Sequence, residues 1–96
     1  MSYKNTNTGQ CYIYILRSIK DKKLYVGYTT NLEKRLKKHK YGEVTSTKKR
    51  RPFELVYKEL CISRYEGRKR EKFLKSLYGY REKYRLIKQY NQNITI

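Results

Sequence analysis

The chain has 96 residues, which is enough for one domain with a modest hydrophobic core and too few for a second domain of ordinary size. Its 25 Lys and Arg residues outnumber 8 Asp and Glu, and the resulting formal net charge of +17 attracts polyanions. The longest uninterrupted apolar run, Tyr12 to Leu16, is too short to cross a membrane. Nucleic acid is therefore the expected partner, and no membrane association is expected.

The N-terminal residues 1–9 are polar and offer nothing to bury, so they are predicted to be a disordered tail before a single domain at 10–90. The tail lacks the apolar centre of a secretory signal, which predicts a cytoplasmic protein. In that compartment Cys11 and Cys61 are expected to be free thiols.

Two segments rich in Tyr, Ile, Val and Leu, at 11–17 and 23–29, predict a pair of strands. The polar Lys20-Asp21-Lys22 between them is typical of a turn, so the two strands are expected to form a β-hairpin. Side chains alternate between the faces of a strand, and antiparallel pairing can place Tyr14 and Tyr25 side by side.

The next segment, Thr30-Asn31-Leu32-Glu33, has the form of a capping box with the hydroxyl at the N-cap. It predicts a helix over about residues 31–41 that ends at Gly42. Arg35 and His39 are one turn apart on one face of this helix, so both are expected near the tyrosines of the hairpin.

A third strand is predicted at 53–60, where Phe53, Leu55 and Tyr57 are expected to share one face. Before it, residues 43–52 show no periodicity and form a polar, cationic loop.

Ser63 and Glu66 repeat the capping-box form and predict a second helix that ends near Gly79. A third helix is expected at 81–90. The order of elements predicts a small α/β domain with a three-stranded antiparallel sheet flanked by helices.

Hydrolysis of a phosphodiester needs an activated water, a positive group for the charge of the transition state, and help for the leaving oxygen. The fixed fork of Arg35 suits a phosphate, and His39 follows one turn later. A lone carboxylate such as Glu71 can hold one Mg²⁺ whose other ligands are waters and phosphate. The few acidic residues argue against a two-metal site.

The ordered set Tyr12-Ile13-Tyr14, Tyr25-Val26-Gly27, Arg35, His39 and Glu71 resembles the GIY-YIG nuclease family. The resemblance is to its small stand-alone bacterial branch, which is related to the N-terminal nuclease domain of the excinuclease C subunit. It extends from about Cys11 to about Gly79, and Tyr12 stands where the family name has glycine.

The resemblance implies that Tyr14 and Tyr25 flank the attacking water, that Arg35 clamps the scissile phosphate and that Glu71 coordinates one Mg²⁺ or Mn²⁺. No organic cofactor is implied. Some relatives have a lysine after the second motif that could assist a tyrosine, but this chain has Tyr28 there, which favours His39 as the helper. Which tyrosine acts as the base stays open.

Glu66 and Glu59 are alternative metal ligands, although a capping role explains the first and a cross-strand ion pair the second. A run of four cations in the polar loop is expected to follow the DNA backbone without selecting sequence: Lys48, Lys49, Arg50 and Arg51.

The sequence thus predicts a metal-dependent DNA endonuclease that nicks one strand per active site, with a protein partner or a dimer as a possible source of targeting. The alternative is a non-catalytic nucleic-acid-binding protein of the same fold, which the charge supports equally well. A ribosome-associated RNA-binding protein is a third hypothesis.

Overall fold

An antiparallel sheet forms the centre of the structure, a computed structural model that describes residues 10–96. Its strands are β1 (Cys11–Ser18), β2 (Leu24–Thr29), β3 (Phe53–Cys61) and β4 (Ile94–Thr95), in the order β2-β1-β3-β4. The predicted antiparallel sheet is confirmed, but it has four strands and not three. The fourth was missed because β4 is two residues long and shows no alternation; it pairs with the start of β3. The predicted tail at residues 1–9 lies outside the described residues.

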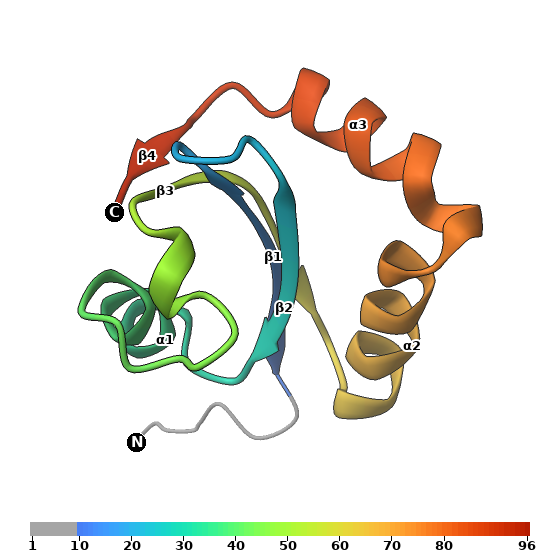
Figure 1. The fold of residues 1–96 in the computed structure, drawn as a ribbon. Coiled ribbons are helices and arrows are strands. Elements are labelled where there is room, and N and C mark those ends of the chain that lie inside the picture. The colour runs from blue at the N-terminus through green and yellow to red at the C-terminus, as the bar shows by residue number, and fades with distance from the viewer. Residues whose placement is uncertain (1–9) are drawn as a thin grey trace, which may run out of the picture.

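Three α-helices cover the two faces of this sheet unequally (Figure 1). α1 (Leu32–Lys40) lies on one face, while α2 (Arg64–Lys75) and α3 (Tyr80–Gln89) lie on the other. Two short 3₁₀ turns, η2 (Lys48–Arg50) and η3 (Leu77–Gly79), complete the described elements. Within residues 10–96, no helix has the length and apolar character that crossing a membrane requires.

Two buried clusters hold the layers together, one on each face of the sheet. The cluster on the α1 side contains Tyr14, Leu16, Phe53 and Leu55. The larger cluster on the α2 and α3 side includes buried Ile, Val and Leu side chains of the sheet and of these two helices: Ile13, Ile15, Val26, Val56, Leu74 and Leu86. Alternation along β1 therefore supplies both cores, and the predicted α/β class is confirmed.

An irregularity in the pairing of β1 with β3 changes the face of the sheet on which the later side chains of β3 lie. Ile15 pairs with Tyr57 and the next residue, Leu16, pairs with Leu55, so Val56 has no partner of its own. Such a bulge reverses the alternation of the residues that follow it. Tyr57 consequently packs against the core on the α2 and α3 side. The prediction that it shares a face with Leu55 is wrong.

The N-cap of α1 is one residue later than predicted. Asn31, not Thr30, occupies it, and its side-chain oxygen accepts a hydrogen bond from the backbone N–H of Lys34 at 3.1 Å. An Asn or Asp oxygen is as effective a cap as a hydroxyl, so the pattern admitted both positions. The cap of α2 is confirmed, since Ser63 Oγ accepts from the backbone N–H of Glu66 at 3.2 Å.

α2 ends at Lys75, and the prediction that it continues to Gly79 is wrong. Ser76 has an extended backbone conformation, and its hydroxyl donates to the carbonyl of Phe73 at 2.6 Å. Gly79 then packs so closely against the last turn of α2 that an added Cβ would overlap the Phe73 carbonyl. The chain can therefore turn sharply into α3.

Cys11 and Cys61 form a disulfide, and the expectation of free thiols is wrong for this structure. The two residues are direct partners in the pairing of β1 with β3, with their Cα atoms 5.0 Å apart. That separation is in the usual range for a disulfide. The composition of the chain could not indicate this pairing, because it depends on the strand register.

Candidate active site

The hairpin tyrosines lie on the face of the sheet that α1 covers. Tyr14 pairs with Gly27 across β1 and β2, and its phenol ring lies over that glycine. A Cβ atom at Gly27 would overlap the ring and the hydroxyl of Tyr14. Glycine is therefore required here to leave room for the phenol. The ring of Tyr25 has its centroid 6.3 Å from that of Tyr14, so the predicted placement of the two tyrosines side by side is confirmed.

A chain of hydrogen bonds connects Tyr14 to α1 and to the loop after it. The hydroxyl of Tyr14 is 2.8 Å from Nε2 of His39, and Nδ1 of His39 is 2.8 Å from Oγ1 of Thr47. The Thr47 hydroxyl donates to the carbonyl of Val44 at 3.4 Å. Because that hydroxyl has only one proton, it accepts from Nδ1–H of His39, which leaves Nε2 to accept the proton of Tyr14.

Burial holds both ends of the Tyr14–His39 pair in their neutral forms. Desolvation, and to a smaller degree the positive charge of Arg35, lowers the pKa of His39 from 6.5 to about 4. Desolvation and then the neighbouring Tyr25 raise the pKa of Tyr14 above its ordinary value, and Arg35 opposes that rise. At neutral pH the proton therefore resides on Tyr14, and His39 has a free lone pair to receive it.

The low pKa of His39 predicts a measurable dependence of stability on pH. The unfolded chain takes up a proton near pH 6.5 and the folded chain only near pH 4, so stability falls as the pH is lowered through this window. Between pH 7.5 and 5.5 the free energy of unfolding should fall by about 1 kcal/mol. This range lies above the ordinary pKa of carboxylates. Urea unfolding at the two pH values measures the change.

A direct NMR titration of the imidazole is the control for that experiment, because His39 is the only histidine of the chain. Its midpoint should lie well below 6.5. A midpoint at or above 6.5 would contradict the proposed neutral state and the direction of the hydrogen-bond chain.

Arg35 lies one helical turn before His39 and is half-buried. Its charge acts on the pKa of both Tyr14 and His39, which places the guanidinium beside the pair. From the other side of the sheet, the carboxylate of Glu71 on α2 also acts on the pKa of Tyr14. The four residues Tyr14, Tyr25, Arg35 and His39 are thus gathered at one place, with Glu71 in electrostatic reach.

The surroundings of the three candidate carboxylates differ. Arg70 holds Glu59 through two hydrogen bonds of 2.8 and 3.2 Å, and Glu66 is exposed in the first turn of α2. Glu71 has a side chain that is only 13% exposed, and its oxygens contact Arg68 at 3.2 Å and Lys75 at 3.0 Å. The charge of Glu71 contributes to the raised pKa of Tyr14.

Two of the four loop cations also have contacts within the protein. Arg50 pairs with Asp21 at 3.0 Å, and Arg51 donates to the carbonyl of Lys40 at the end of α1 at 3.2 Å. Lys48 and Lys49 have exposed side chains. The DNA-binding role of this loop stays a prediction, with Lys48 and Lys49 the better placed of the four.

Thr47 is a site residue that sequence reasoning did not single out. It is fully buried in the middle of the polar loop at 43–52, eight residues after His39. Nothing in its local sequence distinguishes it from Thr45 or Ser46, which are exposed. Its contact with the imidazole depends on how the loop returns to α1, which no short pattern encodes.

The fold and the grouped side chains define a class of protein. The GIY-YIG catalytic domain family matches residues 10–93, and the chain belongs to this family, which is one of endonucleases. The chain therefore carries a nuclease-type fold.

Several curated proteins are similar to the chain over most of its length. A UPF0213 protein of Staphylococcus haemolyticus is 40% identical over 81% of this chain and 94% of its own. A UPF0213 protein of Syntrophus aciditrophicus is 45% identical over 81% and 90%, respectively. A third, from Clostridium perfringens, is 45% identical over 69% and 71%. No solved structure matches the chain significantly. The resemblance to the small stand-alone branch of the family is confirmed.

Proposed function

We propose that this protein is a metal-dependent endonuclease that hydrolyses a phosphodiester bond of DNA and cuts one strand per active site. The observation that carries the proposal is the 2.8 Å hydrogen bond between Tyr14 and a neutral His39, with Arg35 beside both residues. It supplies a path for a proton and a positive charge for a phosphate at one place. The family membership of the chain supports the same reaction class.

Tyr14, rather than Tyr25, is the base in this proposal. Its raised pKa means that it is not a preformed phenolate, so it can take a proton from water only while it gives its own proton to His39. His39 Nε2 receives that proton, and Thr47 keeps the imidazole in the tautomer that allows the transfer. Tyr25 has no such acceptor among its described hydrogen bonds, and it contributes to orienting the water.

The phosphate is held by Arg35, whose planar fork matches two phosphate oxygens and stabilises the added negative charge of the transition state. Glu71 fits the role of a metal ligand because its carboxylate is close enough to act on the pKa of Tyr14, and a single carboxylate suits Mg²⁺ or Mn²⁺ with water and phosphate as other ligands. The described residues contain no group of three or more His, Cys, Asp or Glu that could form a denser site. A bound divalent ion would stabilise the leaving oxygen.

One observation favours the second candidate, a nucleic-acid-binding protein without cleavage. The side chain of Tyr14 is 0% exposed, so water does not reach its hydroxyl in this conformation. In the nuclease proposal, Arg35 turns toward an incoming phosphate and uncovers the phenol, which is consistent with catalytic contacts that form only with substrate.

The experiment that tests the proposal is a gel assay of supercoiled plasmid and of branched DNA at low salt, with Mg²⁺ or Mn²⁺ and with EDTA. The wild-type protein should convert supercoiled plasmid to the nicked form in a metal-dependent way. Arg35→Gln should slow this by about 10²–10³-fold, the usual effect of removing one donor to the transition-state charge.

Lys37→Gln is the matched control, because it removes one positive charge from the same helix at an exposed position. It should leave cleavage within a few-fold of wild type. Binding of both DNAs without nicking in any metal would reject the nuclease and support the binding protein. An equal loss in both variants would show that Arg35 acts only through overall charge.

A further inference from the structure

The end of β2 and the first turns of α1 and α2 enclose a polar cleft of about 260 Å³. Three guanidinium groups and two threonines line it, together with one tyrosine: Arg35, Arg64, Arg68, Thr29, Thr30 and Tyr28. None of these lining residues is acidic. A concave surface with several positive groups and hydroxyl donors, and no carboxylate, is suited to an anion.

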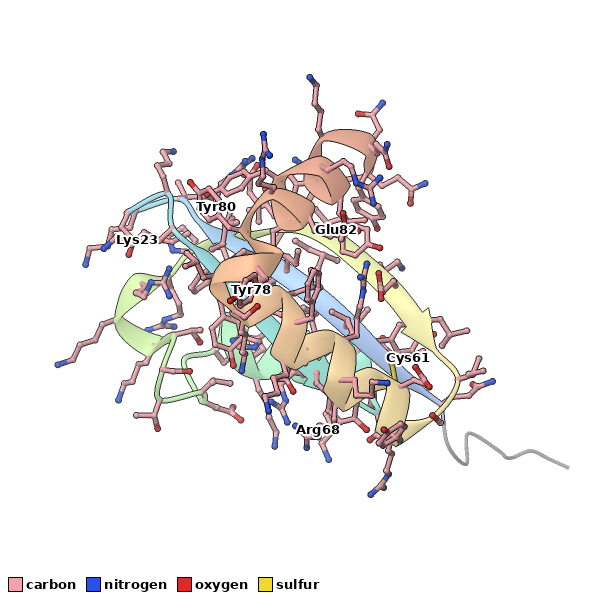
Figure 2. The ribbon with its side chains drawn as sticks, turned by 90° about the vertical axis from the view of Figure 1, so that its right-hand side faces the viewer. Lys23, Cys61, Arg68, Tyr78, Tyr80 and Glu82 are labelled. Atoms are coloured by element: carbon pink, nitrogen blue, oxygen red, sulfur yellow. A yellow bond between two sulfur atoms is a disulfide. The ribbon has the colours of Figure 1, made fainter. Side chains whose placement is uncertain are left out.

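Arg64 and Arg68 approach this cleft from consecutive turns of α2. Arg68 lies over the ring of Tyr28, with its guanidinium carbon 4.1 Å from the ring centroid, and it also contacts Glu71. It occupies the lower edge of the molecule in Figure 2. These two contacts fix the direction of the guanidinium. Arg64, the first residue of α2, makes no hydrogen bond or ion pair recorded among residues 10–96, so its charge is available to a ligand.

Arg35 connects this cleft to the candidate active site. It also lines a second polar cleft of about 360 Å³, with Thr29, Thr30, Asn31, Lys34 and Lys38. The charge of Arg35 acts on Tyr14 and His39 as well. The cleft between α1 and α2 is therefore next to the place where the scissile phosphate would lie, and it brings two further arginines there.

We propose that the cleft between α1 and α2 binds a second backbone phosphate, adjacent to the scissile phosphate on the same strand, through Arg64 and Arg68. A phosphodiester fits better than a free anion because the cleft adjoins the Arg35 site and the chain carries a net charge of +17, which favours a polyanion. The assignment rests on the proposed function in one respect: Arg35 holds the scissile phosphate.

The test is the salt dependence of binding to a short DNA duplex, measured by fluorescence anisotropy in EDTA so that no cleavage occurs. Each phosphate that a protein neutralises contributes about −0.9 to the slope of log K against log salt concentration. Arg64→Gln should reduce the magnitude of the slope by about that amount. Arg81→Gln, the same substitution at an exposed residue of α3, should change it little.

The double variant Arg35→Gln/Arg64→Gln shows whether the two arginines bind two different phosphates or share one. With two phosphates, the two slope changes add to about 1.8; with one shared phosphate, the double variant changes the slope no more than either single variant. The second result would overturn the proposal, as would equal effects of Arg64→Gln and Arg81→Gln. Circular dichroism checks that each variant is folded.

The salt dependence of binding and the cleavage of DNA are measured separately, so one proposal can fail while the other holds. A slope change specific to Arg64 in a protein that never nicks DNA would support a backbone-phosphate site at Arg64 and reject the nuclease, so the neighbouring phosphate at Arg35 would not be a scissile one. Nicking by wild type together with an unchanged slope in Arg64→Gln would support the nuclease and reject the second phosphate site.

Discussion

Glu71→Gln should reduce DNA cleavage by about three orders of magnitude or more, because a bound metal ion stabilises a phosphoryl transition state by several kcal/mol and each 1.36 kcal/mol is a factor of ten. Binding of DNA in EDTA should be retained or strengthened. The substitution removes a negative charge from a chain whose net charge is already +17, and it releases Arg68 and Lys75 from their ion pairs. Single-turnover cleavage rates with Mg²⁺ and anisotropy titrations measure the two effects separately.

Glu66→Gln is the matched control for this prediction. It makes the same chemical change five residues earlier on α2, at an exposed carboxylate. It should leave the cleavage rate nearly unchanged. Cleavage that survives in Glu71→Gln and is lost in Glu66→Gln would transfer the metal ligand to Glu66. Full cleavage in both variants would contradict the proposal that a single carboxylate of α2 binds a metal ion needed for cleavage.

Tyr14→Phe should lower the cleavage rate by about 10²–10⁴-fold, the usual contribution of a positioned acid or base. The ring stays in place over Gly27, and only the hydroxyl that bonds to His39 is lost. DNA binding should therefore change little. Rates at saturating protein, with circular dichroism for the fold, measure the effect.

Tyr25→Phe tests whether that loss is specific to Tyr14. It also removes one phenolic hydroxyl from the hairpin, but from a ring whose hydroxyl has no recorded bond to His39. We expect a clearly smaller loss than for Tyr14→Phe. The reverse order of effects would make Tyr25 the base and leave the hydrogen bond of Tyr14 as a packing feature.

The sequence predicted those parts of the fold that short-range patterns encode. Two segments rich in Tyr, Ile, Val and Leu with a polar turn between them indicated the hairpin, and the caps at the start of α1 and α2 were found to within one residue. β4 was missed because two residues cannot show a period. The reversal at Tyr57 was missed because a bulge depends on how two strands pair, which the sequence of either strand alone does not state.

In the candidate site, too, short-range patterns predicted some features, and contacts between elements determine the others. Helical spacing placed Arg35 and His39 on one face, and strand alternation placed Tyr14 near Tyr25. The hydrogen bond from Tyr14 to His39, the support from Thr47 and the room that Gly27 leaves all depend on contacts between elements. They also bear on the question that the sequence left open, which tyrosine is the base. The catalytic roles themselves stay predictions.

The placement of α1 and α2 on opposite faces of the sheet means that the site has two separately supported halves (Figure 1). Arg35 and His39 come with one half and Glu71 with the other, and the edge strand β2 lies between them. A DNA strand that runs along β2 would contact both helices at once and so connect the two faces of the sheet at its edge. A ligand that binds only the folded state stabilises that state by mass action. Bound substrate would therefore raise the free energy of unfolding as well as occupy the site.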